Sequence, residues 1–264
     1  MNILSIGGSD PSSGAGIQSD IKTFSNYDVY GFTVITAVTS QNTKKVASIE
    51  PVSSKSLKTQ LDSILSDFQI DAVKIGMVYD SKTIKTIHSK LKNLNVPIIV
   101  DPIIKSTTGA ILLKKNAIVD YKKMMIPLAD AITPNKYEAK VLSGISNPGK
   151  AARKMQKMGA KCVIITGATT SKGKISDLIL EENREYTISG KKIPITNHGS
   201  GCNYSASIAV SLAKGNTINS AVKTAKDYVY QSIKNSKKLG KGVRITDRPI
   251  SNGKKELGDS INQF

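Results

Sequence analysis

The stretch NILSIGGSDPSSGAGIQSD, residues 2–20, begins with a short isoleucine-containing apolar run and passes through a glycine-rich loop into a segment that opens a helix. The same order recurs along the chain, where Val- and Ile-rich runs alternate with segments whose apolar residues are spaced as on a helix face. Strand–helix–strand repetition of this kind predicts an α/β fold, in which helices cover both faces of a parallel sheet.

The predicted elements follow one another without a linker or low-complexity tract as far as residue 236. Strands are predicted at residues 2–7, 33–39, 72–76, 97–101, 131–134 and 162–167, with weaker candidates at 175–180 and 184–189. Beyond the helix after the first loop, helices are predicted at 54–68, 83–94, 135–143, 147–158, 202–214 and 217–235. We therefore expect one domain over residues 1–236, and a polar C-terminal extension of uncertain order over 237–264.

The composition is that of an ordinary globular protein, with 39% hydrophobic and 22% charged residues. The longest apolar runs, such as 97–100, are far shorter than the roughly 20 residues that span a bilayer. The first residues carry neither a basic flank nor a small-residue cleavage site, so we expect a cytoplasmic protein without a membrane partner. The two cysteines, Cys162 and Cys202, lie in no CxxC or CxxH pair, which argues against a disulfide scaffold or a structural zinc site.

The formal net charge of +18 indicates a general attraction for anions. Proteins that bind nucleic acid usually gather basic residues into a tract and interleave them with aromatic side chains. Here the lysines are scattered in doublets along the whole chain, only 5% of residues are aromatic, and tryptophan is absent. We therefore expect solvated lysine faces and no dedicated nucleic-acid partner.

Polar residues and glycines follow nearly every predicted strand. In open α/β sheets, ligands bind beyond the carboxyl ends of the strands, so these residues are candidates for a common site. They are Gly8 with its loop, Thr39, Gln41, Met77, Asp101, Asn135, Thr166 and Gly167. Packing alone does not require polar residues at so many strand ends.

Taken singly, three of these segments are weak evidence for a ligand site: the loop of residues 7–20, Gln41, and the pair of Asn135 and Glu138. The loop of residues 7–20 lacks the GxGxxG fingerprint, and no GxxxxGK[ST] motif occurs, so a plain turn and a ligand loop both remain open. Asp20 suits either a ligand contact or an ordinary surface carboxylate. The Gln41 amide suits the edge of a heterocycle, because it offers donors and acceptors, but it also suits a solvated loop. Asn135 and Glu138 have the spacing of a helix capping box, and their oxygens equally suit Mg²⁺ held through water.

The segment HGSGC, residues 198–202, is the strongest local signal. Its two glycines free the backbone to turn N–H groups into one concavity, and the following helix adds its positive end, which together predict an anion hole. The same field is expected to lower the pKa of Cys202 and make it partly thiolate. A nucleophilic cysteine needs a histidine partner, but His88 lies in a predicted helix and His198 is a neighbour in the loop. A thiolate that takes a proton from a hydroxyl, while the hole holds a phosphate, is the other option.

As a set, several segments resemble one enzyme family. GGSDPSSGAGIQSDIKTF, YGFTVITAVTSQNT, DAVKIGM, VDP, TPNKYEA and HGSGC, in this order and spacing, are similar to the hydroxymethylpyrimidine/phosphomethylpyrimidine kinases of thiamine biosynthesis, in the ribokinase-like superfamily. The resemblance covers about residues 2–235. It implies a three-layer α/β/α domain with a central mostly parallel sheet, a homodimer, and ATP with Mg²⁺ as cofactors. It also implies phosphorylation of 4-amino-5-hydroxymethyl-2-methylpyrimidine, and then of its monophosphate to the diphosphate.

The resemblance also implies roles for individual residues. The pyrimidine would be bound by Gly8, Asp20, Thr39 and Gln41, with Met77 packed beside it. The anion hole would be formed by Gly199, Ser200 and Gly201, with Cys202 as the base. The nucleotide would be bound by Asp101, Asn135, Glu138, Thr166 and Gly167, with Glu138 at the metal. Such an assignment suits phosphoryl transfer, which asks mainly for positioning and charge neutralisation.

The chain departs from the family pattern at two positions that usually carry lysine. Thr107 and Thr166 occupy them, and we expect Lys105, Lys172 or Lys174 to supply the missing charge and activity to survive. Two alternatives follow from these features. One is a pyridoxal or pyridoxine kinase of the same superfamily, against which Gln41 favours a pyrimidine. The other is a catalytically weakened relative that binds a ligand or nucleic acid.

Overall fold

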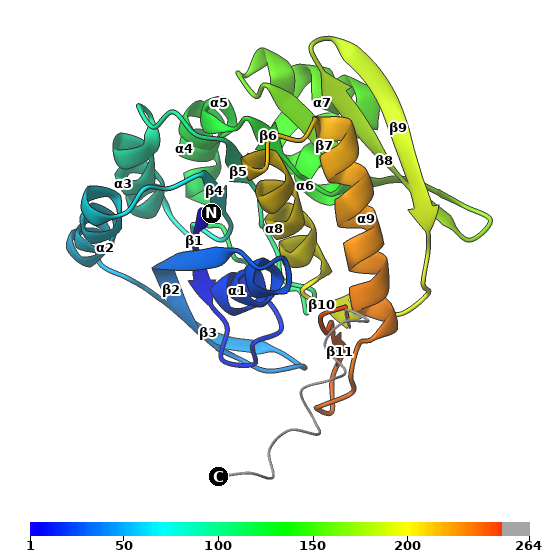
Figure 1. The fold of residues 1–264 in the computed structure, drawn as a ribbon, viewed down its shortest axis with the longest axis horizontal. Coiled ribbons are helices and arrows are strands. Elements are labelled where there is room, and N and C mark those ends of the chain that lie inside the picture. Colours follow the sequence, from blue (N-terminus) through cyan, green and yellow to red (C-terminus); the bar gives the residue numbers. More distant parts are fainter. Residues whose placement is uncertain (250–264) are drawn as a thin grey trace, which may run out of the picture.

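The structure, a computed structural model, describes residues 1–249, and within them a twisted sheet forms the centre of the molecule (Figure 1). Its strands lie in the order β3-β2-β1-β4-β5-β6-β7-β8-β9. Their bounds are β1 (Asn2–Ser9), β2 (Tyr30–Gln41), β3 (Val46–Pro51), β4 (Ala72–Ile75), β5 (Ile98–Val100), β6 (Ala131–Ile132), β7 (Cys162–Ser171), β8 (Lys174–Glu181) and β9 (Arg184–Lys191). The pairs from β2 through β7 are parallel, and β3, β8 and β9 are antiparallel at the two edges. The predicted α/β fold with a mostly parallel sheet is confirmed.

Helices cover both faces of this sheet and complete the three layers. One face carries α1 (Gly16–Asn26), α8 (Ser200–Ala213) and α9 (Ile218–Lys234), which enclose one hydrophobic core against the sheet (Figure 1). The other carries α2 (Ser54–Asp67), α3 (Ser81–Leu91), α6 (Lys136–Ser143) and α7 (Pro148–Lys157), which enclose the larger core. Among the described residues, no helix is long and apolar enough to cross a membrane.

Besides short two-residue strands, an edge strand and a helical stretch of the structure were not among the predicted elements. The edge strand β3 is mostly exposed, so it lacks the apolar run that marks a buried strand. Residues 115–128 form a continuous but irregular helical stretch: η1 (Lys115–Ala117), α4 (Ile118–Asp120), the π-type turn η2 (Tyr121–Met125) and α5 (Ile126–Leu128). Its wide turn and Pro127 break the regular 3.6-residue period on which the helix predictions rest.

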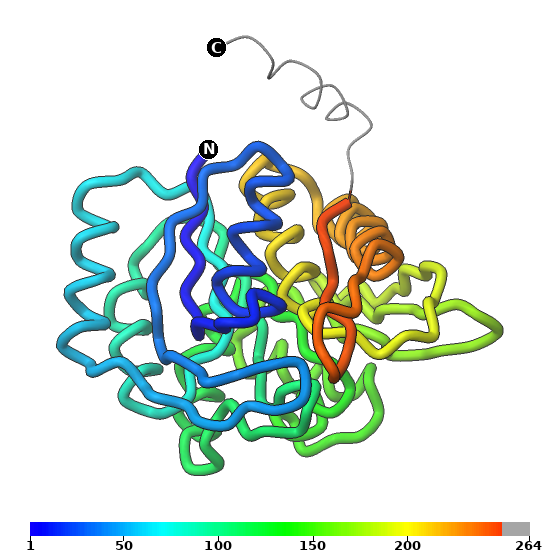
Figure 2. Tube along the Cα trace, turned by 90° about the horizontal axis from the view of Figure 1, so that it is seen from below, coloured from blue at the N-terminus to red at the C-terminus, as the bar shows by residue number. Residues whose placement is uncertain are grey.

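The segment after α9 folds back onto the domain (red in Figure 2). Its short strand β11 (Arg244–Ile245) pairs with β10 (Asn197–His198), just before α8. Gly242 donates its backbone N–H to the Thr43 hydroxyl over 2.9 Å, which ties the segment to the loop after β2. The domain boundary predicted at residue 236 stays a prediction. Residues 237–249 contact residues that enclose the site described below. Residues 250–264 of the predicted extension lie outside the part of the chain that the structure describes.

Candidate active site

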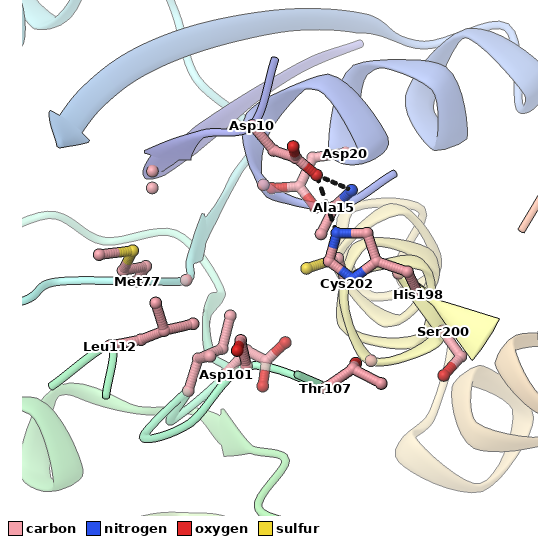
Figure 3. A pocket seen from close by; sticks show the side chains of 18 of the residues that line it. Asp10, Ala15, Asp20, Met77, Asp101, Thr107, Leu112, His198, Ser200 and Cys202 are labelled. Atoms are coloured by element: carbon pink, nitrogen blue, oxygen red, sulfur yellow. Dashed lines mark hydrogen bonds and ion pairs between the residues drawn. The ribbon is translucent and has the colours of Figure 1, made fainter. Parts of the chain in front are cut away.

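A cavity of about 300 Å³ lies at the carboxyl ends of the parallel strands. Nearly all the residues predicted for the site line it: Gly8, Asp20, Thr39, Gln41, Met77, Asp101, Asn135, Glu138, Thr166, Gly199, Ser200, Gly201 and Cys202 (several are labelled in Figure 3). Gly167 instead lines a neighbouring cavity of about 400 Å³. Asn135, Thr166, Ser200, Gly201 and Tyr204 belong to the walls of both cavities. Two of the three residues predicted to form the anion hole, Ser200 and Gly201, therefore lie where the two cavities meet.

The backbone at Gly199 has the form that an anion hole requires. Its φ of 97° lies in the left-handed region, and a Cβ atom there would approach the Gly14 carbonyl oxygen to 1.8 Å, so only glycine fits. Helix α8 begins at the next residue, and the first N–H groups of a helix have no acceptor within it. These groups and the helix dipole can hold a phosphate at the boundary of the two cavities.

Cys202 lies in this first turn, but its predicted thiolate character is wrong. The side chain is only 6% exposed, and burial raises the pKa of the thiol to about 12. Lys74 opposes this shift, while the charges of Asp20 and Asp101 add to it. Desolvation and the two carboxylates outweigh the helix end, so the resting site holds a neutral thiol. Cys202 still lines the same cavity as Asp20 and Gln41.

A buried ion pair, which the sequence interpretation missed, lies under this cavity. Lys74 on β4 is 1% exposed, and its Nζ lies 3.0 and 2.9 Å from the two carboxylate oxygens of Asp20, which is fully buried. Burial alone would lower the pKa of the lysine, but the attraction of Asp20 outweighs it and raises that pKa. Ser5 also donates to Asp20 over 2.6 Å. A lysine inside the apolar run AVKI was the signal for this pair, and the predicted pyrimidine contact of Asp20 stays a prediction.

A second missed group joins Asp10, His198 and Gln41 at the cavity wall. Asp10 is 3% exposed and His198 is 7% exposed. His198 Nε2 lies 2.9 Å from Asp10 Oδ2 and 2.7 Å from the side-chain amide of Gln41 (the contacts of Asp10 with His198 and Ala15 are dashed in Figure 3). The sequence interpretation considered His198 only as a partner for Cys202, so its actual partners were not found.

Asn135 and Glu138 form the capping box that their spacing allows. The Asn135 side chain accepts the Glu138 N–H over 3.0 Å, and Glu138 Oε2 accepts the Asn135 N–H over 2.9 Å. Glu138 is buried, and burial together with the charge of Asp101 raises its pKa to about 8. Asp101 in turn accepts a hydrogen bond from Ser205 over 3.0 Å, and burial raises its pKa as well.

This carboxylate pair bears on the predicted magnesium. Within residues 1–249, no cluster of three or more carboxylate, histidine or cysteine side chains could by itself hold a metal. Magnesium at phosphoryl-transfer sites usually takes one or two carboxylates, with phosphate oxygens and waters as the other ligands. Asp101 and Glu138 fit that requirement, because burial and the charge of Asp101 raise the pKa of Glu138, and a cation beside the two carboxyl groups would relieve their repulsion.

The structure also locates the lysines expected to compensate for Thr107 and Thr166. Lys105 lines the first cavity, beside Thr107. Lys172 and Lys174 lie at the turn between β7 and β8, and line neither cavity. Lys226, which was not predicted, lines the second cavity and pairs with Asp177 over 2.9 Å.

A mostly parallel sheet between two helical layers, with two cavities that share wall residues at a helix N-terminus, suits a small-molecule phosphotransferase. Comparison with known sequences makes the assignment specific. The family model described as phosphomethylpyrimidine kinase matches residues 10–247, and the chain belongs to this family.

Individual relatives agree with this assignment. The hydroxymethylpyrimidine/phosphomethylpyrimidine kinase of Haemophilus influenzae is 38% identical over 251 residues, which cover 91% of this chain and 93% of the relative. The crystal structure of the phosphomethylpyrimidine kinase from Clostridium difficile 630 is 36% identical, with a TM-score of 0.77, over 88% of this chain and 99% of that one. The pyridoxal kinase of Staphylococcus aureus, solved with AMP-PCP and pyridoxal, is 31% identical, with a TM-score of 0.84, over 96% of this chain and 95% of that one.

Proposed function

We propose that the protein transfers the γ-phosphoryl group of ATP to the hydroxymethyl group of 4-amino-5-hydroxymethyl-2-methylpyrimidine, and then phosphorylates the monophosphate to the diphosphate. The observation that carries this proposal is the pair of cavities that share Ser200 and Gly201 in their walls. The first cavity would hold the alcohol and the second the nucleotide. The transferred phosphoryl group would then lie at the mouth of α8, where the N–H groups can neutralise its charge.

The shape of the first cavity suits a flat ring. Met77 is buried at its wall, and a Cβ atom on Gly8 would lie 2.9 Å from the Met77 sulfur, so the missing side chain of Gly8 makes room for Met77. The thioether offers a polarizable surface to an aromatic ring. Gln41, on the same cavity, offers the polar contact that an aminopyrimidine requires.

Cys202 is our proposed proton acceptor, acting through its minor thiolate form. Phosphoryl transfer proceeds through a loose transition state, so the hydroxyl proton need leave only late. The proton moves from the hydroxyl oxygen to the thiolate sulfur, and the thiol then returns it to water. Because the pKa of Cys202 is about 12, this role makes the rate depend on pH.

We further propose that Asp101 and Glu138 hold Mg²⁺ beside the nucleotide phosphates, and that Lys105 adds charge where Thr107 replaces a lysine. The metal would supply charge neutralisation for the phosphates. Lys105 lies 5.0 Å from the centre of the Tyr137 ring, which holds it at the edge of the cavity. A homodimer, which the family resemblance implies, and a cytoplasmic location, which we expect from the sequence, belong to the same proposal.

The proposal is tested by incubating the protein with Mg-ATP and the hydroxymethylpyrimidine, and by following both phosphorylated products. We expect wild type to form mono- and diphosphate, and Cys202→Ala to lose about 100-fold or more of the rate. Cys162→Ala is the matched control, because Cys162 is buried in β7 and lines neither cavity. Failure of wild type to phosphorylate the pyrimidine would refute the function, whereas full activity of Cys202→Ala in both steps would refute only the base assignment.

Pyridoxal phosphorylation is a second candidate, favoured by the higher TM-score of the Staphylococcus aureus pyridoxal kinase than of the Clostridium difficile enzyme. Sequence identity favours the pyrimidine kinases, at 36–38% against 31%. Competition between the two alcohols in one assay decides between them, and we expect a higher kcat/KM for the pyrimidine.

A further inference from the structure

The contacts among Asp10, His198 and Gln41 determine how the glutamine faces the cavity. The three side chains come from separate parts of the chain: the residue after β1, strand β10 and the end of β2. The amide atom of Gln41 that lies 2.7 Å from His198 Nε2 is placed as the nitrogen. Oxygen and nitrogen have nearly the same shape in an amide, so the hydrogen-bond partners must decide which atom is which.

Asp10 fixes the proton on the histidine. Burial would raise the pKa of Asp10, but hydrogen bonds from His198 and Ser12 lower it overall, so the group is ionised at neutral pH. Its Oδ1 accepts from the Ser12 N–H and hydroxyl, and its Oδ2 accepts from the Ala15 N–H over 2.9 Å. An ionised carboxylate only accepts, so the His198 Nε2 that lies 2.9 Å away must carry a hydrogen.

This proton decides the orientation of the amide. A protonated Nε2 cannot accept from the amide nitrogen of Gln41, so the near amide atom must be the oxygen. Turning the imidazole ring over instead would put the Cε1 carbon, which is a poor hydrogen-bond partner, where Nε2 faces Asp10 and Gln41. The ring is also packed tightly, since a Cβ atom on Gly14 would lie 2.5 Å from His198 Cδ2.

Thr39 supports the same orientation from the other side. Its hydroxyl has one hydrogen, which lies within reach of the Ser9 carbonyl oxygen at 3.0 Å and of the far amide atom of Gln41 at 3.4 Å. The nearer carbonyl takes the hydrogen, which leaves the lone pairs of the hydroxyl facing Gln41. An NH₂ group suits that position better than an oxygen.

We propose that Asp10 and His198 are positioning residues that hold the Gln41 oxygen toward the histidine and the Gln41 NH₂ group toward Thr39 and the cavity. Gln41 then presents an N–H donor, and it selects a substrate whose ring carries an unprotonated nitrogen at that place. This inference rests on the proposed function for the identity of the ring. The orientation of the amide itself is a property of the protein without any ligand.

The proton on His198 can be observed directly. The sequence contains two histidines, so His88→Gln in an untagged chain leaves His198 as the single one. His88 lies on α3 and lines neither cavity, so it serves as a silent background for the experiment. With ¹⁵N-labelled histidine at pH 8 and no substrate, we expect Nε2 to be protonated. An unprotonated Nε2 would overturn the proposal whatever the enzyme's activity.

Substrate discrimination tests the consequence. Two pyridine analogues of the hydroxymethylpyrimidine, each with one ring nitrogen replaced by C–H, are compared with the parent pyrimidine. We expect kcat/KM of the His88→Gln protein to fall about 10- to 100-fold for one analogue, because an N–H donor loses its acceptor. Asp10→Asn on that background should reduce this ratio to about threefold or less and leave KM for ATP unchanged.

The outcomes separate the two proposals. A merely structural role of Asp10 would weaken all three alcohols by the same factor and keep the ratio, which would overturn the positioning role. A protein that phosphorylates none of the three would refute the proposed function, while the ¹⁵N spectrum would still decide the orientation of the amide.

Discussion

The buried pair of Lys74 and Asp20 gives the sharpest test of the energetics under the site. In Lys74→Met, the apolar chain fills most of the lysine's volume, but Asp20 keeps only the hydrogen bond from Ser5. Both side chains are almost fully buried, and breaking such a pair by removing one partner costs about 3–5 kcal/mol. At roughly 2–4 °C per kcal/mol for a chain of this size, Tm should fall by about 6–20 °C.

Urea unfolding measures this loss, and a second substitution tests its cause. If the cost comes from the unpaired carboxylate, Asp20→Asn added to Lys74→Met should restore at least half of the lost stability. The deficit should also shrink as the pH falls, because a buried and unpaired Asp20 binds a proton more readily when folded than when unfolded. Lys58→Met, at the exposed pair of Lys58 with Asp62, should leave the midpoint unchanged. A loss below about 1 kcal/mol in Lys74→Met, or additive effects in the double variant, would refute this reasoning.

Three further predictions follow from the site. Because the pKa of Cys202 is about 12, its thiolate fraction rises tenfold per pH unit below that value. We therefore expect kcat to rise between pH 7 and 9.5. A flat profile, or the same slope in Cys202→Ala, would contradict the base role. Gly199→Ala should abolish activity and lower Tm, because the new Cβ atom would collide with Gly14. Gly215→Ala, also at positive φ but with open space around it, should lower Tm only slightly and keep activity. Equal effects of the two substitutions would contradict the close approach of Gly199 to Gly14. The pKa of about 8 for Glu138 means that the folded state binds its proton more tightly than the unfolded state, so the free energy of unfolding should fall as pH rises from about 4.5 to 8. Urea unfolding measures this fall, and Glu138→Gln should flatten it. Parallel pH profiles of the two proteins would contradict the raised pKa.

Much of the fold was readable because apolar periodicity follows burial. The central parallel strands β4 and β5 are buried at every residue, and their Val and Ile side chains mark them in the sequence. Edge strand β3 could not be found this way, since it is largely exposed. In the stretch 115–128, the buried residues Ala117, Tyr121 and Met125 are spaced four apart. Its irregular turns depart from the regular 3.6-residue period, so a search for that period does not identify it as a helix.

For the candidate site, the positions of residues could be predicted from the sequence, but their protonation and contacts could not. Residues at strand ends, such as Gln41 and Asp101, could be placed from topology, because parallel strands bring their carboxyl ends together. The protonation of Cys202 could not be predicted, since it depends on desolvation and on two carboxylates that are distant in sequence. The same holds for His198, whose partners Asp10 and Gln41 lie more than 150 residues away.

The return of the C-terminal segment to β10 makes the site a meeting point of distant parts of the chain. The Thr246 hydroxyl donates to the His198 carbonyl oxygen over 3.0 Å, and Gly199 packs against Gly14, so residues near positions 14, 199 and 246 must assemble together. Contacts of such long sequence separation form late, because the intervening chain must first give up its conformational freedom. The loop before α8, which includes Gly199, should therefore be among the last parts of the molecule to become ordered during folding, after the sheet that supports it.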